Sequence, residues 1–228
     1  MGWKTQSILI RPALLDGGPD KLLADLGYER RRKVDDTSFS RAGAGSIWIG
    51  SIEDCIVIYT HFAGAFFDDD FAKDGDFIEF KNALLRRFPE ADVAVFSAHS
   101  VVAHWGFAIF RCGALIRRQF GADGTTLCDE GSRLPVEEAY IARFQRIETD
   151  GEVRYRDPDH PERDDMTEAD LGELLVPEIG YFYAGVPLDA LDAPGTNFWL
   201  NDDEARFRAS MQQYRAKVQT RPWWKFWG

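Results

Sequence analysis

The sequence predicts an α+β fold in which helices pack on a mixed, largely antiparallel sheet. Residues 93–96, Val-Ala-Val-Phe, form an unbroken apolar run, which is typical of a central strand covered on both faces. Residues 105–111 and 114–120 flank Cys112 and Gly113, and because Gly113 can adopt the positive φ of a tight turn, these two segments predict a hairpin. The strands come in runs and do not alternate strictly with helices, which favours antiparallel pairing.

The first ninety residues are expected to add a strand, a second hairpin and two helices. Residues 7–11 form a short strand, and residues 19–26 form a short helix with proline in its first turn and glycine just past its end. Residues 47–52 and 55–60 are rich in Ile and Val and predict the second hairpin. The helix over 76–88 opens with an Asp and Glu at capping-box spacing, repeats Phe and Leu at helical spacing, and stops at the following proline.

The carboxy-terminal part of the chain is expected to be mainly helical. A helix opens at Pro135, and Thr167 caps a further short helix. A longer helix begins at Asn201, where a capping box precedes a stripe of Phe, Met, Tyr and Val. Residues 156–165 are polar, contain proline and lack periodicity, so we expect a loop there.

Length and charge limit the classes of protein to consider. At 228 residues the chain is long enough for one large domain, so residues 1–228 are expected to form a single unit. Thirty-eight acidic against 27 basic residues give a net charge of −11, which repels nucleic-acid phosphates and anionic lipid heads. We therefore expect no nucleic-acid partner, and a basic protein partner is easier to accommodate. Solubility explains the same charge without any partner.

Cysteine usage indicates a reducing compartment. Cys55, Cys112 and Cys128 are odd in number and widely spaced, which is typical of free thiols and not of a disulfide framework or a C-x-x-C metal site. The amino terminus has no apolar core long enough for a signal peptide, and no segment approaches the roughly 20 apolar residues of a membrane span. These features predict a cytoplasmic protein.

Two of the four histidines are candidates for catalytic chemistry. His61 ends a predicted strand close to the carboxylates from Asp68 to Asp70, so a site that draws on His61, His99 and these carboxylates is physically allowed. His99 and His104 are five positions apart, which places them on opposite faces if one strand continues through both, and a shared metal then requires a bend. The competing interpretation is that each histidine is partly buried and hydrogen-bonded.

Other motifs with known chemistry are absent. No serine lies in a G-x-S-x-G motif, and the glycine-rich residues 41–45 lack the third glycine of a dinucleotide fingerprint and the lysine of a phosphate loop. Residues 68–79 have carboxylates at several calcium-loop positions but carry alanine at the fifth place and lack the glycine at the sixth. We therefore predict no cofactor and no dedicated metal site.

The most unusual segment is the carboxy-terminal tail, residues 221–228. It holds four large aromatic side chains within five positions: Trp223, Trp224, Phe226 and Trp227. Burying each contributes about 1.5 to 3 kcal/mol, so leaving all four in water is costly. The tail can bury these side chains against its own domain, against a partner protein or at a lipid interface. The acidic charge of the rest of the chain disfavours the lipid interface. These aromatic side chains are the partner-binding candidates.

Between residues 99 and 138 the chain carries a recognisable pattern. It reads H-S-V-V, W-G-F-A, a hairpin glycine, L-I-R-R, D-G and G-x-x-L-P-x-E, at residues 99–102, 105–108, 113, 115–118, 123–124 and 131–137. This pattern resembles an uncharacterised family of bacterial cytoplasmic proteins. The resemblance implies a bacterial cytoplasmic fold, and it implies no activity.

The function expected from these observations is protein binding. The net charge, the missing catalytic motifs and the aromatic tail favour a non-catalytic bacterial interaction module, immunity-like or adaptor-like, with an acidic surface. The alternative is a small-molecule hydrolase, acid–base or metal-assisted, whose site gathers His99, His61, Asp68 and Asp70. A third interpretation, a structural subunit of a larger assembly, predicts a large apolar surface patch.

Overall fold

A computed structural model describes residues 4–38, 46–67, 75–99, 103–149, 151–187 and 193–200 of the chain. In chain order its elements are β1 (Lys4–Arg11), α1 (Gly18–Asp25), β2 (Arg31–Ser38), β3 (Ile47–Ile52), β4 (Cys55–Tyr59), the 3₁₀ helix η2 (His61–Phe66), α2 (Gly75–Arg87), β5 (Asp92–His99), β6 (His104–Arg111), β7 (Ala114–Ala122), β8 (Thr125–Gly131), α3 (Pro135–Ile141), β9 (Gln145–Thr149), β10 (Glu152–Arg156), α4 (Glu168–Ala184) and β11 (Pro194–Leu200).

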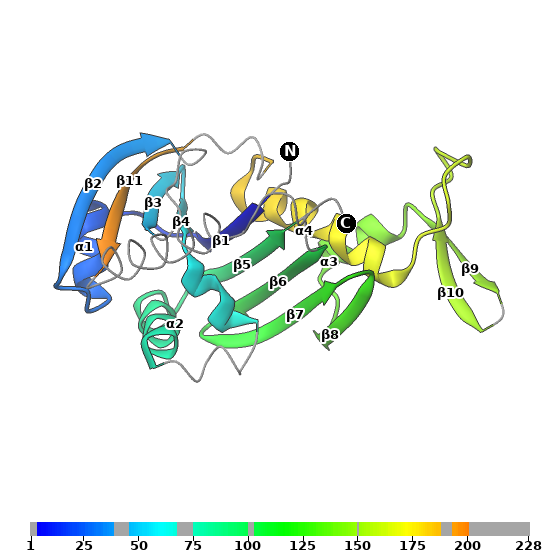
Figure 1. Ribbon diagram of the computed structural model, residues 1–228, viewed down its shortest axis with the longest axis horizontal. Coiled ribbons are helices and arrows are strands. Elements are labelled where there is room, and N and C mark those ends of the chain that lie inside the picture. Colours follow the sequence, from blue (N-terminus) through cyan, green and yellow to red (C-terminus); the bar gives the residue numbers. More distant parts are fainter. Residues whose placement is uncertain are drawn as a thin grey trace, which may run out of the picture.

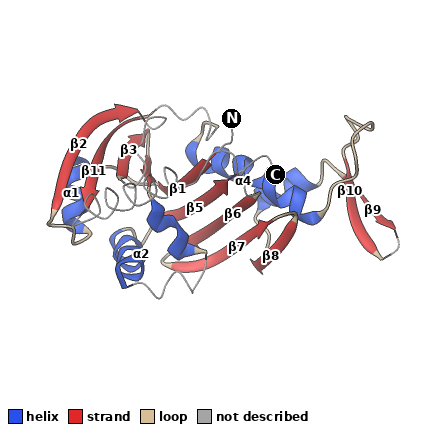
Figure 2. Cartoon of the chain, in the orientation of Figure 1, coloured by secondary structure: helices blue, strands red, loops and turns tan. Residues whose placement is uncertain are grey.

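A nine-stranded sheet forms the body of the molecule, in the order β2-β11-β3-β4-β1-β5-β6-β7-β8 (Figures 1 and 2). Every neighbouring pair in this sheet is antiparallel. The predicted α+β class with an antiparallel sheet is therefore confirmed. β9 and β10 pair with each other in a separate hairpin, which projects from the body at the end far from α1 (Figure 1).

The central strand and its neighbouring hairpin form where the sequence predicts them. β5 has β1 on one side and β6 on the other, and its six inner residues are buried. β6 and β7 pair directly, and the turn between them places Cys112 at φ 50° and Gly113 at φ 73°. Two consecutive positive φ values are those of a type I′ turn, which matches the twist of the flanking strands.

The sheet is covered on both faces because its inner strands are apolar on both. In β1, Ile8 and Ile10 face a core that includes Phe80 of α2 together with side chains of α1 and η2. Leu9 faces the opposite core, which contains Ile179 and neighbouring residues of α4, with α3 packed at its border. This alternation follows the two-residue period of a strand. α1, η2 and α2 thus form one layer, and α3 and α4 form the other.

Helix α4 is longer than the short helix predicted after Thr167. The Thr167 hydroxyl accepts a hydrogen bond from the Asp170 N–H at 3.1 Å, and the Asp170 carboxylate accepts from the Thr167 N–H at 2.8 Å, so the predicted cap is present. The helix then continues through Pro177 for a total of 17 residues. It continues because Val176 and Ile179, on either side of the proline, are buried against the sheet, and this packing outweighs the backbone hydrogen bond that proline removes.

The last described strand, β11, was not predicted. The chain after α4 was expected to be mainly helical, whereas β11 lies between β2 and β3 and buries Phe198 and Leu200. The Thr196 hydroxyl donates to the Asp36 carboxylate at 2.6 Å, which joins β11 to the edge strand. The helix predicted from Asn201 lies outside the described residues.

Two buried tryptophans on the α4 face of the sheet lie directly against glycines. A methyl group added at Gly172 of α4 would come within 2.0 Å of the Trp105 ring, so this glycine allows the helix to approach the sheet. Trp48 similarly contacts Gly50 and Gly195, where an added methyl would lie 2.5 and 2.4 Å from its ring. The absence of a side chain at these positions makes room for the indoles.

Candidate functional site

His99 and His104 are brought together by the hairpin between β5 and β6. The two residues are direct partners in the register of these strands, so their side chains leave the same face of the sheet. The condition under which they would lie on opposite faces, one continuous strand through both, does not hold, because the chain reverses direction between them. The bend that a shared ligand requires is present.

The surroundings of this histidine pair are partly polar and partly buried. Ser97 is buried on the same face, two residues before His99. The His99 Nδ1 atom is buried and has no hydrogen-bond partner among the residues that the structure describes. Burial, and secondarily the charge of His99, lower the pKa of His104 below its usual value. Burial therefore favours the neutral form of the His104 ring.

His61 occupies a different environment. It begins η2, where its ring stacks on Phe62 with a centroid distance of 4.4 Å and meets the edge of Phe77 at 5.7 Å. The carboxylates from Asp68 to Asp70 lie outside the described residues. Within the described ranges, no three side chains of His, Cys, Asp or Glu gather as a metal would require. The predicted His61, His99 and aspartate site remains a prediction.

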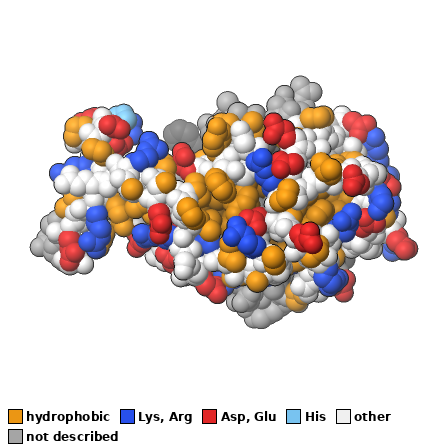
Figure 3. Space-filling model, turned by 180° about the vertical axis from the view of Figure 1, so that it is seen from behind, with side chains coloured by type: hydrophobic (Ala, Val, Ile, Leu, Met, Phe, Trp, Pro, Cys, Tyr) orange, Lys and Arg blue, Asp and Glu red, His pale blue; other side chains and the backbone are white. Residues whose placement is uncertain are grey.

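The outer face of α4 carries an apolar surface that the sequence analysis did not single out. Leu174, Tyr181 and Phe182 are 40%, 53% and 58% exposed and follow the solvent side of the helix. Figure 3, which views the molecule from behind, shows hydrophobic side chains gathered on that side with acidic and basic side chains between them. Glu173 and Glu178 flank this surface and form no ion pair within the described ranges. Extending the 3.6-residue helical period past Pro177 would have placed these side chains on one face. The proline instead led to the prediction of a shorter helix.

The loop before α4, residues 157–165, is acidic, as its sequence indicates. Arg156 and Asp165 form an ion pair at 2.8 Å across its base, and the hydrogen bond from Arg156 lowers the pKa of Asp165. His160 lies 3.0 Å from the Asp157 carboxylate, and this contact lowers the pKa of Asp157. Carboxylates therefore continue from this loop onto α4, where Glu168 pairs with Arg133 at 2.8 Å.

A buried ion cluster fixes α3 to the sheet, and the sequence analysis missed it. Arg117 Nε donates to both carboxylate oxygens of Glu137 at 3.0 Å, and Arg117 also contacts the Asp129 carboxylate. Burial alone would lower the pKa of Arg117, but the hydrogen bonds that it donates to Glu137 and Asp129 raise it, so the guanidinium stays charged. An arginine within a predicted strand, followed by a glutamate in the first turn of a helix, was the available signal.

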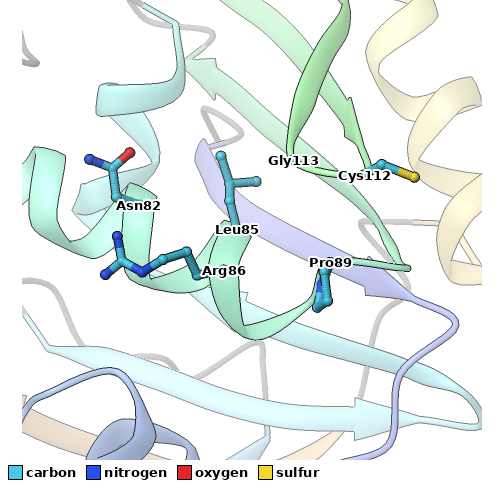
Figure 4. Close-up of a pocket in the computed structure, with 6 residues that line it drawn as sticks. All are labelled: Asn82, Leu85, Arg86, Pro89, Cys112 and Gly113. Carbon is cyan, nitrogen blue, oxygen red and sulfur yellow. The ribbon is translucent and has the colours of Figure 1, made fainter.

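The described surface also contains a shallow pocket at the carboxy-terminal end of α2, with a volume of about 340 Å³. Figure 4 shows its lining residues: Asn82, Leu85, Arg86, Pro89, Cys112 and Gly113. Cys112 is an exposed free cysteine, but its thiol points away from the Arg86 guanidinium (Figure 4). Because no two reactive groups converge in this pocket, we assign it no chemistry.

The remaining candidates lie at the end of the chain. Trp223, Trp224, Phe226 and Trp227 are outside the described residues. Among the described helices, none has the length and apolar character needed to cross a membrane.

Comparison with known proteins identifies a family without an assigned activity. Neither the curated proteins nor the solved structures contain a match to this chain. A family model described as a family of unknown function (DUF6928) matches residues 27–175, a span that includes the segment 99–138 on which the sequence resemblance rests. Since this match covers more than half of the sequence, the chain belongs to the DUF6928 family, whose function is unknown.

Proposed function

We propose that this chain is a non-catalytic protein-binding module of the bacterial cytoplasm, and that the outer face of α4 contacts a basic partner. The observation that carries the proposal is the exposure of Leu174, Tyr181 and Phe182 along one side of this helix. Aromatic side chains are enriched in the cores of protein interfaces, where tyrosine is a frequent hot spot. A helix with this exposed face gains stability when a partner covers it.

The charge around the same face favours a basic partner. Glu173 and Glu178 lie beside the apolar side chains without ion-pair partners in the described ranges, and the acidic residues 157–165 precede the helix. Carboxylates beside an apolar centre accelerate association with a cationic surface and oppose anionic partners. The net charge of −11 acts in the same direction at longer range.

The test is affinity capture from the native host with a surface variant and a matched control. The variant replaces Leu174, Tyr181 and Phe182 with serine, and the control replaces the comparably exposed Leu14 and Leu127 with serine. Substitutions at such exposed positions change stability by roughly 0.5 kcal/mol or less each, so both proteins are expected to fold. Capture is carried out at low and moderate salt.

We expect one or more proteins to bind the wild-type chain and the control, and to be lost with the α4 variant. We also expect binding to weaken at the higher salt because carboxylates contribute to association. Equal capture by all three proteins, or no specific capture at either salt, contradicts the proposal.

The aromatic tail is a second candidate contact region for the same function. Trp223, Trp224, Phe226 and Trp227 remain the residues proposed from the sequence. Deletion of residues 221–228, added to the same capture experiment, separates the two regions. Loss of the partner after this deletion, with retention by the α4 variant, would move the proposed contact surface from α4 to the tail.

The alternative function, a small-molecule hydrolase, is favoured by one feature, the juxtaposition of His99 and His104 on neighbouring strands. An imidazole can act as a general base, and two neighbouring imidazoles can hold a metal-bound water. A panel of chromogenic carboxylic and phosphoric esters tests this function. Turnover by the wild-type chain that is lost in His99→Asn would support it, and absence of turnover across the panel would count against it.

A further inference from the structure

The cross-strand pair of His99 and His104 has the geometry of a two-ligand site. Directly opposite residues on antiparallel strands have Cβ atoms about 4.5–5.5 Å apart. A metal ion bound by imidazole nitrogens lies about 2.0–2.1 Å from each of them. Because both rings project from the same face of the sheet, two nitrogen atoms can converge on one ion between them.

One ring of this pair has a nitrogen atom without a partner. The Nδ1 atom of His99 is buried and accepts or donates no hydrogen bond within the part of the chain that the structure describes. A buried polar atom in this condition is costly, since it has lost its water and gained nothing in return. A metal ion, or water bound to one, is a partner that satisfies such a nitrogen.

The neighbouring residues give the pair a partly apolar wall. Phe67 lies over Gly106, the next same-face position along β6 from His104, where an added methyl would come within 3.2 Å of the Phe67 ring. Ser97, on the same face of β5, is buried. An apolar side chain beside such a pair lowers the local dielectric constant, which strengthens interactions between an ion and its ligands.

The choice between a cation and an anion rests on charge and ligand type. The net charge of −11 draws cations toward the protein. Imidazole nitrogen suits zinc, copper and nickel, whereas magnesium and calcium prefer oxygen ligands.

We propose that His99 and His104 together bind one divalent transition-metal ion of the zinc, nickel or copper class, with water completing its coordination. The site lies on the sheet face opposite to α4, so it is separate from the surface proposed for protein binding. The two proposals can therefore fail independently.

The first test is calorimetric titration of the full chain with zinc chloride after treatment with a chelator. We expect one ion per chain, and we expect His99→Asn and His104→Asn each to weaken binding by roughly tenfold or more, because each leaves one of two protein ligands. His160→Asn is the matched control, since His160 is an exposed loop residue that pairs with Asp157. No zinc binding by the wild-type chain, or equal binding by all variants, overturns the proposal.

A spectroscopic readout separates loss of a ligand from loss of the fold. With copper(II) bound, electron paramagnetic resonance of the wild-type chain is expected to show coupling to two imidazole nitrogens, and of either single variant to one. Circular dichroism verifies that the variants are folded. Copper coupled to no histidine nitrogen in the wild-type chain overturns the proposal.

Titration with inorganic phosphate tests the sign of the charge that the site prefers. It is carried out in parallel with the zinc titration. Phosphate binding that depends on His99 and His104, without zinc binding by the wild-type chain, would assign an anion site in place of the metal site.

Discussion

Removing one member of the buried ion pair between Arg117 and Glu137 should destabilise the whole domain. The side chains are 1% and 0% exposed, and the guanidinium donates to both carboxylate oxygens at 3.0 Å while its Cζ lies 5.7 Å from the centre of the Phe107 ring. Glu137 also accepts the Leu134 N–H at 2.8 Å at the start of α3. Glu137→Ala therefore leaves a buried cation with Asp129, which is 40% exposed, as its remaining carboxylate partner.

The expected magnitude follows from burial. Removing one partner of a buried ion pair costs about 3–5 kcal/mol, which for a chain of this size lowers the melting temperature by roughly 6–20 °C. Replacing Arg117 with Met and Glu137 with Leu together should recover most of this loss, because no uncompensated buried charge remains. Urea denaturation followed by circular dichroism provides the free energies of unfolding for the full double-mutant cycle.

The neighbouring pair of Arg118 and Glu130 is the matched control. It joins β7 to β8, with N and O atoms 2.6 Å apart, but Glu130 is 53% exposed. Glu130→Ala should therefore cost about 1 kcal/mol or less. A cost below about 1 kcal/mol for Glu137→Ala as well, or additive effects of the two single substitutions at Arg117 and Glu137, would refute the reasoning.

Three further predictions concern single residues. A thiol reagent should modify the exposed Cys112 in the folded protein, whereas Cys55, whose pKa burial raises to about 11, should react only after unfolding in urea. Gly172→Ala should lower the unfolding free energy by about 1–3 kcal/mol, since its methyl would overlap an indole, while Gly75→Ala, which meets open space, should be neutral or stabilising. With a chelator present, the free energy of unfolding should fall as the pH drops below 6.5, because the lowered pKa of His104 in the folded state means that the unfolded state takes up the proton first. His104→Gln should reduce this pH dependence, which is measured as the change of the urea midpoint with pH.

Local patterns predicted most of the elements around β5. The hairpin of β6 and β7 was predictable because Gly113 tolerates the positive φ of a tight turn, and the flanking segments are rich in apolar residues. β11 was not predictable in the same way. Its sequence, PGTNFWL, contains proline, glycine and asparagine, and its pairing partners β2 and β3 lie about 150 residues earlier in the chain. Contacts between residues this distant in sequence override local propensity.

The candidate sites show the same division between local and distant information. His99 and His104 could be singled out from the sequence, but their position on one face of the sheet could not. It depends on a reversal of the chain between them. The exposed face of α4 was hidden because Pro177 is a helix breaker by local rules, and burial of the neighbouring residues against the sheet maintains the helix. The Arg117 cluster required knowledge of which strand α3 covers.

The contacts between tryptophan rings and glycines tie together positions that are remote in the chain. A family member with a smaller apolar residue in place of Trp105 no longer needs glycine at position 172, and a member that keeps the indole cannot replace that glycine without separating α4 from the sheet. The same reasoning joins Trp48 to Gly195. Across relatives, the members of each pair should therefore change in concert, and a change in one member without the other should be rare among functional sequences.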